Sequence, residues 1–235
     1  MKVHAYYQTF IDIPQDVVEK VDHFIVSSIH FDLATDGKPA TIHLNDNHPD
    51  SSVFDKMWEN VEAWSKIPGK HVSLMIGGAG GAYQSLFKDY NLFYSMLLKQ
   101  LKKRPYITGI VFDVEEMISL SYLQNFIDDI STLIPKYTLY ASPCQYCLAP
   151  PSIGMGGFNY RDVKNIDIFL VQAYYDFSYD VLCKIDRYWK DKKIILGLLT
   201  DTVPLDKLKT VTEKMSNVVL WELGSAEGIE WVRSV

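Results

Sequence analysis

Apolar residues recur along the chain in two alternating patterns. Short runs rich in β-branched and aromatic residues predict buried strands, and longer stretches with an apolar residue every three or four positions predict helices. The predicted strands are Lys2–Tyr7, Phe24–Phe31, Val72–Ile76, Ile107–Glu116, Tyr137–Ala141, Ile168–Tyr174, Ile194–Leu199 and Val218–Trp221. The predicted helices run from Pro14 toward Val21, from Ser52, from about Ser85 to Lys103, Ser121 to Ile134, Val181 to Trp189, Leu205 to Met215, and at the C-terminus.

Strands and helices that alternate at about thirty residues per pair are typical of a (β/α)₈ TIM barrel. The chain of 235 residues is small for that fold but sufficient, and we expect residues 1–235 to form a single domain. One additional hairpin is predicted, because Asp36-Gly37 is a turn signal that precedes the alternating stretch Thr41–Leu44.

The stretch Ile107–Glu116 carries the strongest candidate chemistry. Side chains alternate between the two faces of a strand, so Val111, Asp113 and Glu115 share one face. Asp113 and Glu115 would then lie roughly 6.6 Å apart along the backbone. Two carboxylates this close repel each other, which favours one of them holding a proton near neutral pH and serving as a general acid. The alternative is a solvated acidic pair at a strand end.

Composition and charge narrow the classes of partner. A net charge of −6 disfavours nucleic acid and anionic membrane surfaces, whereas a neutral sugar polymer is compatible with it. The sequence shows neither a stretch with the length of a membrane span nor a secretory signal at Met1–Phe10. We therefore expect a protein that binds no membrane, and the sequence gives no indication of its oligomeric state.

Three cysteines, Cys144, Cys147 and Cys183, are present. The odd count is incompatible with a complete disulfide framework, and Cys144-x-x-Cys147 lacks the second pair that a zinc site requires. We expect free thiols in a reducing compartment, which favours the cytoplasm and leaves secretion by another route open.

The strand that ends at Glu115 resembles the signature of the family 18 glycoside hydrolases, the chitinases and their relatives, which reads Asp-Gly-x-Asp-x-Asp-x-Glu. Gly109, Asp113 and Glu115 match it, whereas Thr108 and Val111 replace the first and middle Asp. Four further strand ends are similar to family motifs, on strands one, three, six and eight. They are Ala5-Tyr6-Tyr7, Gly77-Gly78 with Met75 in place of Ser, Gln172-Ala173-Tyr174-Tyr175 with Tyr175 in place of Asn, and Trp221. Each of these motifs also has a purely structural explanation, as a tight turn or as a core aromatic residue. The resemblance therefore depends on all of them occurring together, in the family's order along the chain.

This resemblance implies hydrolysis of β-1,4-linked N-acetylglucosamine glycans by a substrate-assisted, retaining mechanism without a metal or organic cofactor. Glu115 would be the general acid and base, while Asp113 and Tyr174 would hold the acetamido group that attacks the anomeric carbon. Substrate-binding roles are implied for Tyr6, Phe31, Gly77, Gly78, Gln172 and Trp221, with Tyr83 and Tyr146 as further candidates for sugar stacking. The resemblance also implies cis peptides at His30–Phe31 and Trp221–Glu222, and a barrel without the added α+β insertion of some chitinases.

Two departures from the family pattern leave two classes of function open. Val111 and Met75 replace polar residues that contact each other in the family, and we expect them to form an apolar layer below Asp113. A glycan hydrolase is one hypothesis. A sugar-binding or storage protein that has kept the barrel and lost turnover is the other.

Overall fold

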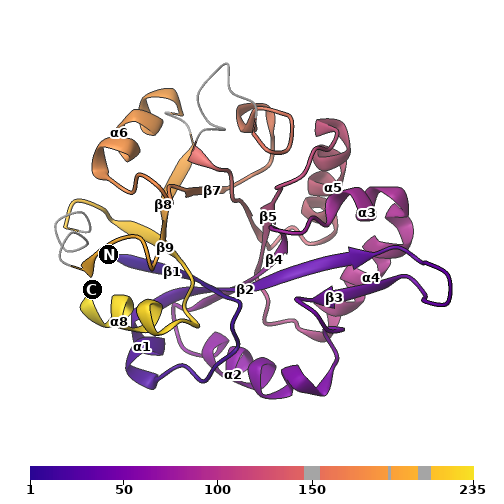
Figure 1. Ribbon diagram of the computed structural model, residues 1–235, viewed down its shortest axis with the longest axis horizontal. Coiled ribbons are helices and arrows are strands. Elements are labelled where there is room, and N and C mark those ends of the chain that lie inside the picture. Colours follow the sequence, from indigo (N-terminus) through magenta and orange to yellow (C-terminus); the bar gives the residue numbers. More distant parts are fainter. Residues whose placement is uncertain (146–153, 190–191, 206–212) are drawn as a thin grey trace.

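The barrel consists of eight parallel strands that close on themselves. A computed structural model describes residues 1–145, 154–189, 192–205 and 213–235. The barrel strands are β1 (Lys2–Tyr7), β2 (Val21–Asp32), β4 (His71–Gly77), β5 (Gly109–Asp113), β6 (Thr138–Ala141), β7 (Ile168–Gln172), β8 (Lys193–Leu199) and β9 (Asn217–Trp221). They pair in chain order, and parallel pairing of β1 with both β2 and β9 completes the ring visible in Figure 1. The predicted TIM barrel is confirmed.

One strand lies outside the ring. β3 (Thr41–Leu44) pairs antiparallel with the last part of β2, from Ile29 opposite Leu44 to Asp32 opposite Thr41. The two strands form an arm that projects beyond the barrel (Figure 1). Gly37 adopts a φ of 82° in the connecting turn, where a residue with a Cβ would be strained. The hairpin that Asp36-Gly37 predicts is therefore confirmed.

Helices surround the barrel, and one predicted helix is divided. They are α1 (Gln15–Lys20), α2 (Asp55–Ser65), α3 (Tyr83–Lys88), α4 (Tyr90–Lys103), α5 (Leu120–Leu133), α6 (Tyr179–Tyr188) and α8 (Ala226–Ser234), with 3₁₀ turns at Ser52–Phe54 and Tyr160–Asp162. The single helix expected from Ser85 to Lys103 is wrong, because Asp89 leaves the helical region with a φ of −136° and a ψ of 65°. Most of the helix expected from Leu205 to Met215 lies outside the described residues. None of the helices among the described residues has the length and apolar content that crossing a bilayer would require.

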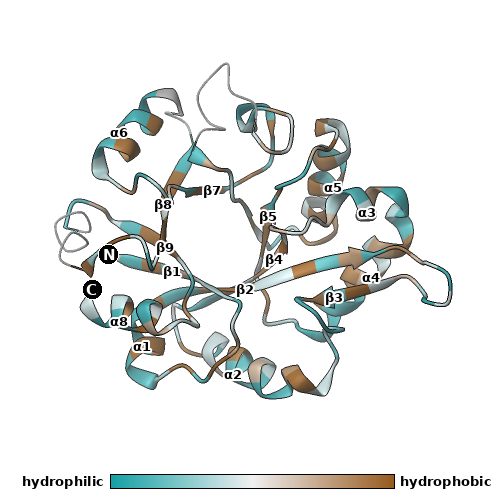
Figure 2. Cartoon of the chain, in the orientation of Figure 1, coloured by the Kyte–Doolittle hydropathy of each residue, from teal (hydrophilic) through white to brown (hydrophobic). Residues whose placement is uncertain are grey.

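The core has two layers that follow the alternation of the strands. The inner layer takes one side chain from each barrel strand: Tyr6, Ile25, Met75, Val111, Tyr140, Leu170, Ile195 and Val219. Neighbouring residues such as Ile110 and Phe112 face outward and pack against the helices. Figure 2 shows the helices alternating between hydrophobic and hydrophilic residues, as expected for helices with one buried face. Val111 is thus inside the barrel, as predicted.

A chain of polar side chains lies toward the N-terminal ends of the strands. The Nδ1 atoms of His4 and His23 are 2.9 Å apart, and His23 Nε2 is 2.7 Å from Ser73 Oγ. Burial lowers the pKa of His4 to about 4, with Asp22 opposing this shift, and burial together with the neighbouring His4 lowers the pKa of His23 well below its usual value. Both imidazoles are therefore neutral at neutral pH.

The cysteines differ from the expectation of free thiols. Cys183 is free, but Cys144 is part of a disulfide. An odd cysteine count argues against a complete framework, yet it is compatible with one bridge. Cys147 lies outside the described residues.

Candidate active site

Asp113 is the last residue of β5 and is 3% exposed. Its backbone carbonyl accepts a hydrogen bond of 2.9 Å from Gly78 N, and its carboxylate Oδ1 accepts one of 3.0 Å from Gln172 Nε2. Burial raises the pKa of Asp113 well above its usual value, the negative charge of Glu115 adds to this, and the Gln172 hydrogen bond opposes it. The folded protein therefore stabilises the protonated form of Asp113.

Glu115 lies just beyond the end of the strand. β5 ends at Asp113, three residues before the end of the predicted strand Ile107–Glu116, so strand alternation does not by itself place Glu115. Glu115 is nevertheless half-buried, and its charge acts on Asp113, Tyr6 and Tyr174. The four side chains that the sequence motifs place on three different strands therefore gather at one end of the barrel.

A row of polar groups joins β1, β6 and β7 beside Asp113. Tyr6 Oη and Ser142 Oγ are 2.9 Å apart. Gln172 Nε2 donates to Ser142 O at 3.2 Å and lies 3.3 Å from Ser142 Oγ, while also reaching Asp113. The sequence analysis did not single out Ser142, and only its position directly after a predicted strand could have indicated it.

Met75 and Val111 form the apolar layer below Asp113. They are opposite each other in the β4–β5 register, and they are 1% and 0% exposed. The predicted apolar layer of Met75 and Val111 is confirmed. Asp113 consequently receives its hydrogen bond from the β7 side, through Gln172, and has no polar support from the inner layer beneath it.

Two glycines allow the loop after β4 to approach Asp113. Gly77 and Gly78 have φ values of 90° and 93°, in the left-handed region that favours glycine. A Cβ on Gly77 would lie 2.2 Å from Asp113 O, and a Cβ on Gly78 would lie 2.7 Å from Met75 Cε. The structure therefore explains both glycines by their contact with the site, in addition to the substrate contact that the resemblance implies.

The aromatic candidates fall into two groups. The ring of Trp221 is 5.0 Å from that of Tyr6, so Trp221 lies over the inner layer of the barrel. Tyr174 is half-buried, and burial, followed by the neighbouring Tyr6 and Asp113, raises its pKa well above the usual value. Both residues are positioned at the site.

Phe31 and Tyr83 are instead packed in the protein interior. Phe31 is 3% exposed and its ring contacts Phe93, while Tyr83 is fully buried and donates a hydrogen bond of 2.8 Å to Ile76 O. Their rings are not available for stacking on a sugar, which corrects that expectation. The alternation of β2 directs Phe31 toward the helices. Tyr146 lies outside the described residues.

Two peptide bonds that precede non-proline residues are cis in the part of the chain that the structure describes. Trp221–Glu222 is cis, as the family resemblance implies. The second is Ser27–Ser28 rather than His30–Phe31, so that expectation was wrong by three positions.

Glu116 has a structural role that the sequence analysis missed. Its carboxylate accepts hydrogen bonds from the backbone N–H groups of Ala82 and Tyr83, and one of 3.2 Å from Gln84 N. These donors lie at the first turn of α3, where a carboxylate is favoured. Glu116 thus fixes the glycine-rich loop Gly77–Ala82 next to Asp113 and Glu115.

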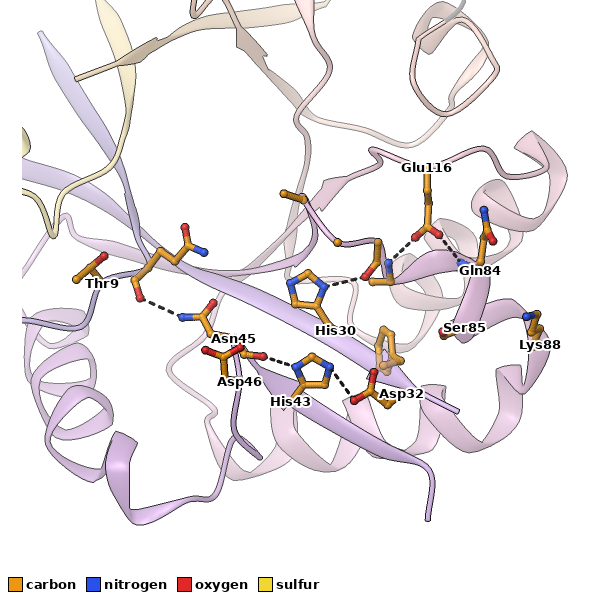
Figure 3. Close-up of a pocket in the computed structure, with 16 residues that line it drawn as sticks. Thr9, His30, Asp32, His43, Asn45, Asp46, Gln84, Ser85, Lys88 and Glu116 are labelled. Atoms are coloured by element: carbon orange, nitrogen blue, oxygen red, sulfur yellow. Dashed lines mark hydrogen bonds and ion pairs between the residues drawn. The ribbon is translucent and has the colours of Figure 1, made fainter. Parts of the chain in front are cut away.

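A groove of about 820 Å³ begins at this loop and extends along β2 and β3 (Figure 3). Glu116 and the stretch 79–82 form one wall, and Gln8, Thr9 and Asn45 belong to the lining on another side. His30 and His43 stack on each other at 5.4 Å between these walls. The groove therefore runs from Glu116, the residue after Glu115 in the chain, over the hairpin arm.

Comparison with known proteins shows which solved structures share this fold. No protein-family model and no curated protein sequence matches the chain. Among solved structures, a chitinase, ChiC, from Aspergillus fumigatus is similar with a TM-score of 0.80 and 24% identity, over 94% of this chain and 91% of that one. A fungal endo-β-N-acetylglucosaminidase from glycosyl hydrolase family 18 is similar with a TM-score of 0.83 and 22% identity, over 100% and 96% of the two chains. The chain thus has the fold of the family 18 chitinases and endo-β-N-acetylglucosaminidases.

Proposed function

We propose that this chain, with its family 18 chitinase fold, is a glycoside hydrolase that cleaves β-1,4-linked N-acetylglucosamine glycans. Chitin, peptidoglycan fragments and the chitobiose core of N-glycans all contain this linkage. One observation carries the proposal: a buried Asp113 with a raised pKa lies beside Glu115, Gln172 and Tyr174 at the carboxyl end of the barrel strands. Active sites of TIM barrels lie at this end.

In the proposed reaction, Glu115 protonates the glycosidic oxygen, and the substrate's own acetamido oxygen attacks the anomeric carbon. The oxazolinium ion that forms is positively charged. This cation lies next to Asp113 and favours the ionised form of its carboxyl group, because the positive charge offsets the cost of burying a carboxylate. Tyr174 would hold the acetamido oxygen, and Glu115 would then act as base toward water.

The polar row on β1, β6 and β7 supports a site that still functions without the family's polar layer. Gln172 donates to Asp113, and Ser142 and Tyr6 hold Gln172 in place. A buried carboxylate with one fixed donor is oriented, even though Met75 and Val111 contribute none. Trp221 would form the floor under the reacting sugar, in contact with Tyr6.

A second candidate function is carbohydrate binding without turnover. The observation in its favour is the apolar pair Met75–Val111, which removes hydrogen bonds that would otherwise tune Asp113 during the reaction. The two candidates share a substrate class and differ only in whether the bond is broken.

Turnover and binding of the same sugar separate the two functions. We expect the purified protein to release chromophore from a chromogenic chito-oligosaccharide, and calorimetry to give saturable binding of the unlabelled sugar. Binding without release of chromophore or reducing ends, over long incubation at high protein concentration, would establish the non-catalytic alternative. If the protein neither hydrolyses nor binds the sugar, the proposal that its ligand is an N-acetylglucosamine glycan is wrong.

A further inference from the structure

Ser142 carries a buried hydroxyl group that contacts two residues of the candidate site. It follows β6 directly, it is 2% exposed, and its backbone N–H donates to Phe112 O at 2.9 Å. Its Oγ is 2.9 Å from Tyr6 Oη and 3.3 Å from Gln172 Nε2. The hydroxyl of Ser142 therefore connects a side chain of β1 with a side chain of β7.

The acceptors around Gln172 determine the orientation of its side-chain amide. Gln172 Nε2 lies 3.2 Å from Ser142 O and 3.0 Å from Asp113 Oδ1. A backbone carbonyl oxygen can only accept a hydrogen bond, so the NH₂ group of Gln172, and not its carbonyl oxygen, must face Ser142. The two amide hydrogens are then directed at Ser142 and at Asp113.

The hydroxyl hydrogen of Ser142 is available for Tyr6. Because the amide nitrogen of Gln172 can only donate, Ser142 Oγ accepts from it. The hydroxyl group can then donate its own hydrogen to Tyr6 Oη. This assignment gives both the donor and the acceptor of a buried hydroxyl a partner, which matters because an unpaired buried polar group is costly.

The layer beneath Asp113 cannot replace this support. Met75 and Val111 belong to the inner apolar layer, and their side chains offer no hydrogen-bond donor. Without the Ser142 hydroxyl, the amide of Gln172 would keep only the backbone carbonyl of residue 142 as a partner on that side. The direction of the hydrogen bond to Asp113 would then be less well defined.

We infer that Ser142 is a positioning residue of the candidate site, whose hydroxyl group holds the Gln172 amide so that it donates to the Asp113 carboxylate. Ser142 belongs to none of the motifs on which the family resemblance depends. The effect of this residue on hydrolysis rests on the proposed function. Its effect on Gln172 and Asp113 does not, because it can be measured in the absence of substrate.

The pKa of Asp113 reports on the orientation of Gln172. Burial raises this pKa, the charge of Glu115 raises it further, and the hydrogen bond from Gln172 lowers it. A loosened Gln172 amide should therefore raise the pKa of Asp113 still more. The tyrosines that face Asp113 from other elements have pKa values that burial raises, so they stay protonated at acidic and neutral pH: Tyr6, Tyr83, Tyr160 and Tyr174.

An NMR titration of labelled aspartate carboxyl carbons tests the inference. The reference protein carries Glu115→Gln, so that Asp113 titrates without its charged neighbour, and the Asp113 signal is the one that Asp113→Asn removes. Into this protein we introduce Ser142→Ala, Gln172→Ala, or both. Each single change should raise the pKa of Asp113. The double change should raise it no further than Gln172→Ala does, because the serine acts through the glutamine.

Ser73→Ala is the matched control. It removes another buried serine hydroxyl, which contacts His23 Nε2 at 2.7 Å toward the N-terminal ends of the strands. It should leave the pKa of Asp113 unchanged. The inference is overturned if Ser142→Ala leaves this pKa unchanged, if Ser73→Ala raises it equally, or if the increases from Ser142→Ala and Gln172→Ala simply add.

Turnover gives a second readout, in proteins that keep Glu115. For a chromogenic chito-oligosaccharide, Ser142→Ala should lower kcat about tenfold and change KM less than about twofold, because the side chains that contact the sugar remain. Ser73→Ala should change neither value. A kcat in Ser142→Ala equal to that of the wild type would overturn the inference. If the wild type shows no turnover, the proposed hydrolysis fails, and the NMR titration alone decides whether Ser142 positions Gln172.

Discussion

Protonation of the buried histidine pair should destabilise the fold as the pH falls. His4 has a pKa of about 4 in the folded protein, against 6.5 when it is exposed in the unfolded chain. The unfolded state therefore binds more protons between these two values. Stability that is fully present above pH 6.5 is lost as the pH falls toward 4.

The size of this effect follows from the two pKa values. A difference of about 2.5 pKa units corresponds to roughly 3 kcal/mol in the free energy of unfolding, of which about 2 kcal/mol is lost by pH 5. His23 acts in the same direction, because its pKa is also lowered by burial. Asp113 acts in the opposite direction, because its pKa is raised, so the net pH dependence of the wild type understates the histidine contribution.

The contribution of His4 to the pH dependence of stability can be isolated by urea unfolding. The free energy of unfolding is measured for the wild type and for His4→Gln at pH 7 and pH 5, at constant ionic strength. The amide keeps a polar partner for His23 Nδ1 and does not titrate. At pH 7 the wild type should be the more stable protein. By pH 5 its advantage should shrink by about 2 kcal/mol. His48→Gln, at a partly exposed surface histidine, should show no such change. If the wild type and His4→Gln differ in free energy of unfolding by the same amount at both pH values, this account of the His4–His23 pair is refuted.

Two further predictions concern the core. Val111→Asp should lower the free energy of unfolding by about 3–5 kcal/mol in urea titrations, because it buries an unpaired carboxyl group. Adding Met75→Ser should restore at least about 1 kcal/mol, because it supplies a partner across the β4–β5 register. Losses in the two single variants that simply add in the double variant would contradict this coupling. Arg104→Met should lower the free energy of unfolding by about 3 kcal/mol in the same assay, because the buried guanidinium contacts the Trp58 ring at 4.1 Å and Asp50 Oδ1 at 3.1 Å. A decrease below about 1 kcal/mol would show that these contacts contribute little to stability.

The sequence predicts the barrel well because each barrel strand is a short apolar run that forms the same two-sided packing. Alternation along β5 correctly separates Val111 from Ile110 and Phe112. Local propensity does not predict the break at Asp89, since both flanking segments carry helical patterns and only the tertiary structure fixes where α3 ends.

The candidate site is predicted only where linear motifs exist. Asp113, Glu115 and Gln172 follow from motif matches at strand ends, and the structure brings them together. Ser142 and Glu116 were missed because their roles depend on contacts across the barrel and with the first turn of α3, which leave no periodic signal in the sequence. The groove over β3 depends in the same way on how four parts of the chain meet, after β1, along β2 and β3, after β4 and after β5.

The central claim is that Glu115 is the acid and base of a retaining glycosidase, and one experiment tests it directly. Hydrolysis of a β-linked chito-oligosaccharide is followed by NMR, which gives both the rate and the anomer first released, for the wild type, Glu115→Gln and the exposed control Glu227→Gln. We predict initial release of the β-anomer, an unchanged rate in Glu227→Gln, and a loss of at least about 10²-fold in Glu115→Gln with sugar binding retained. Initial release of the α-anomer, or a Glu115→Gln rate equal to that of the wild type, would contradict the claim.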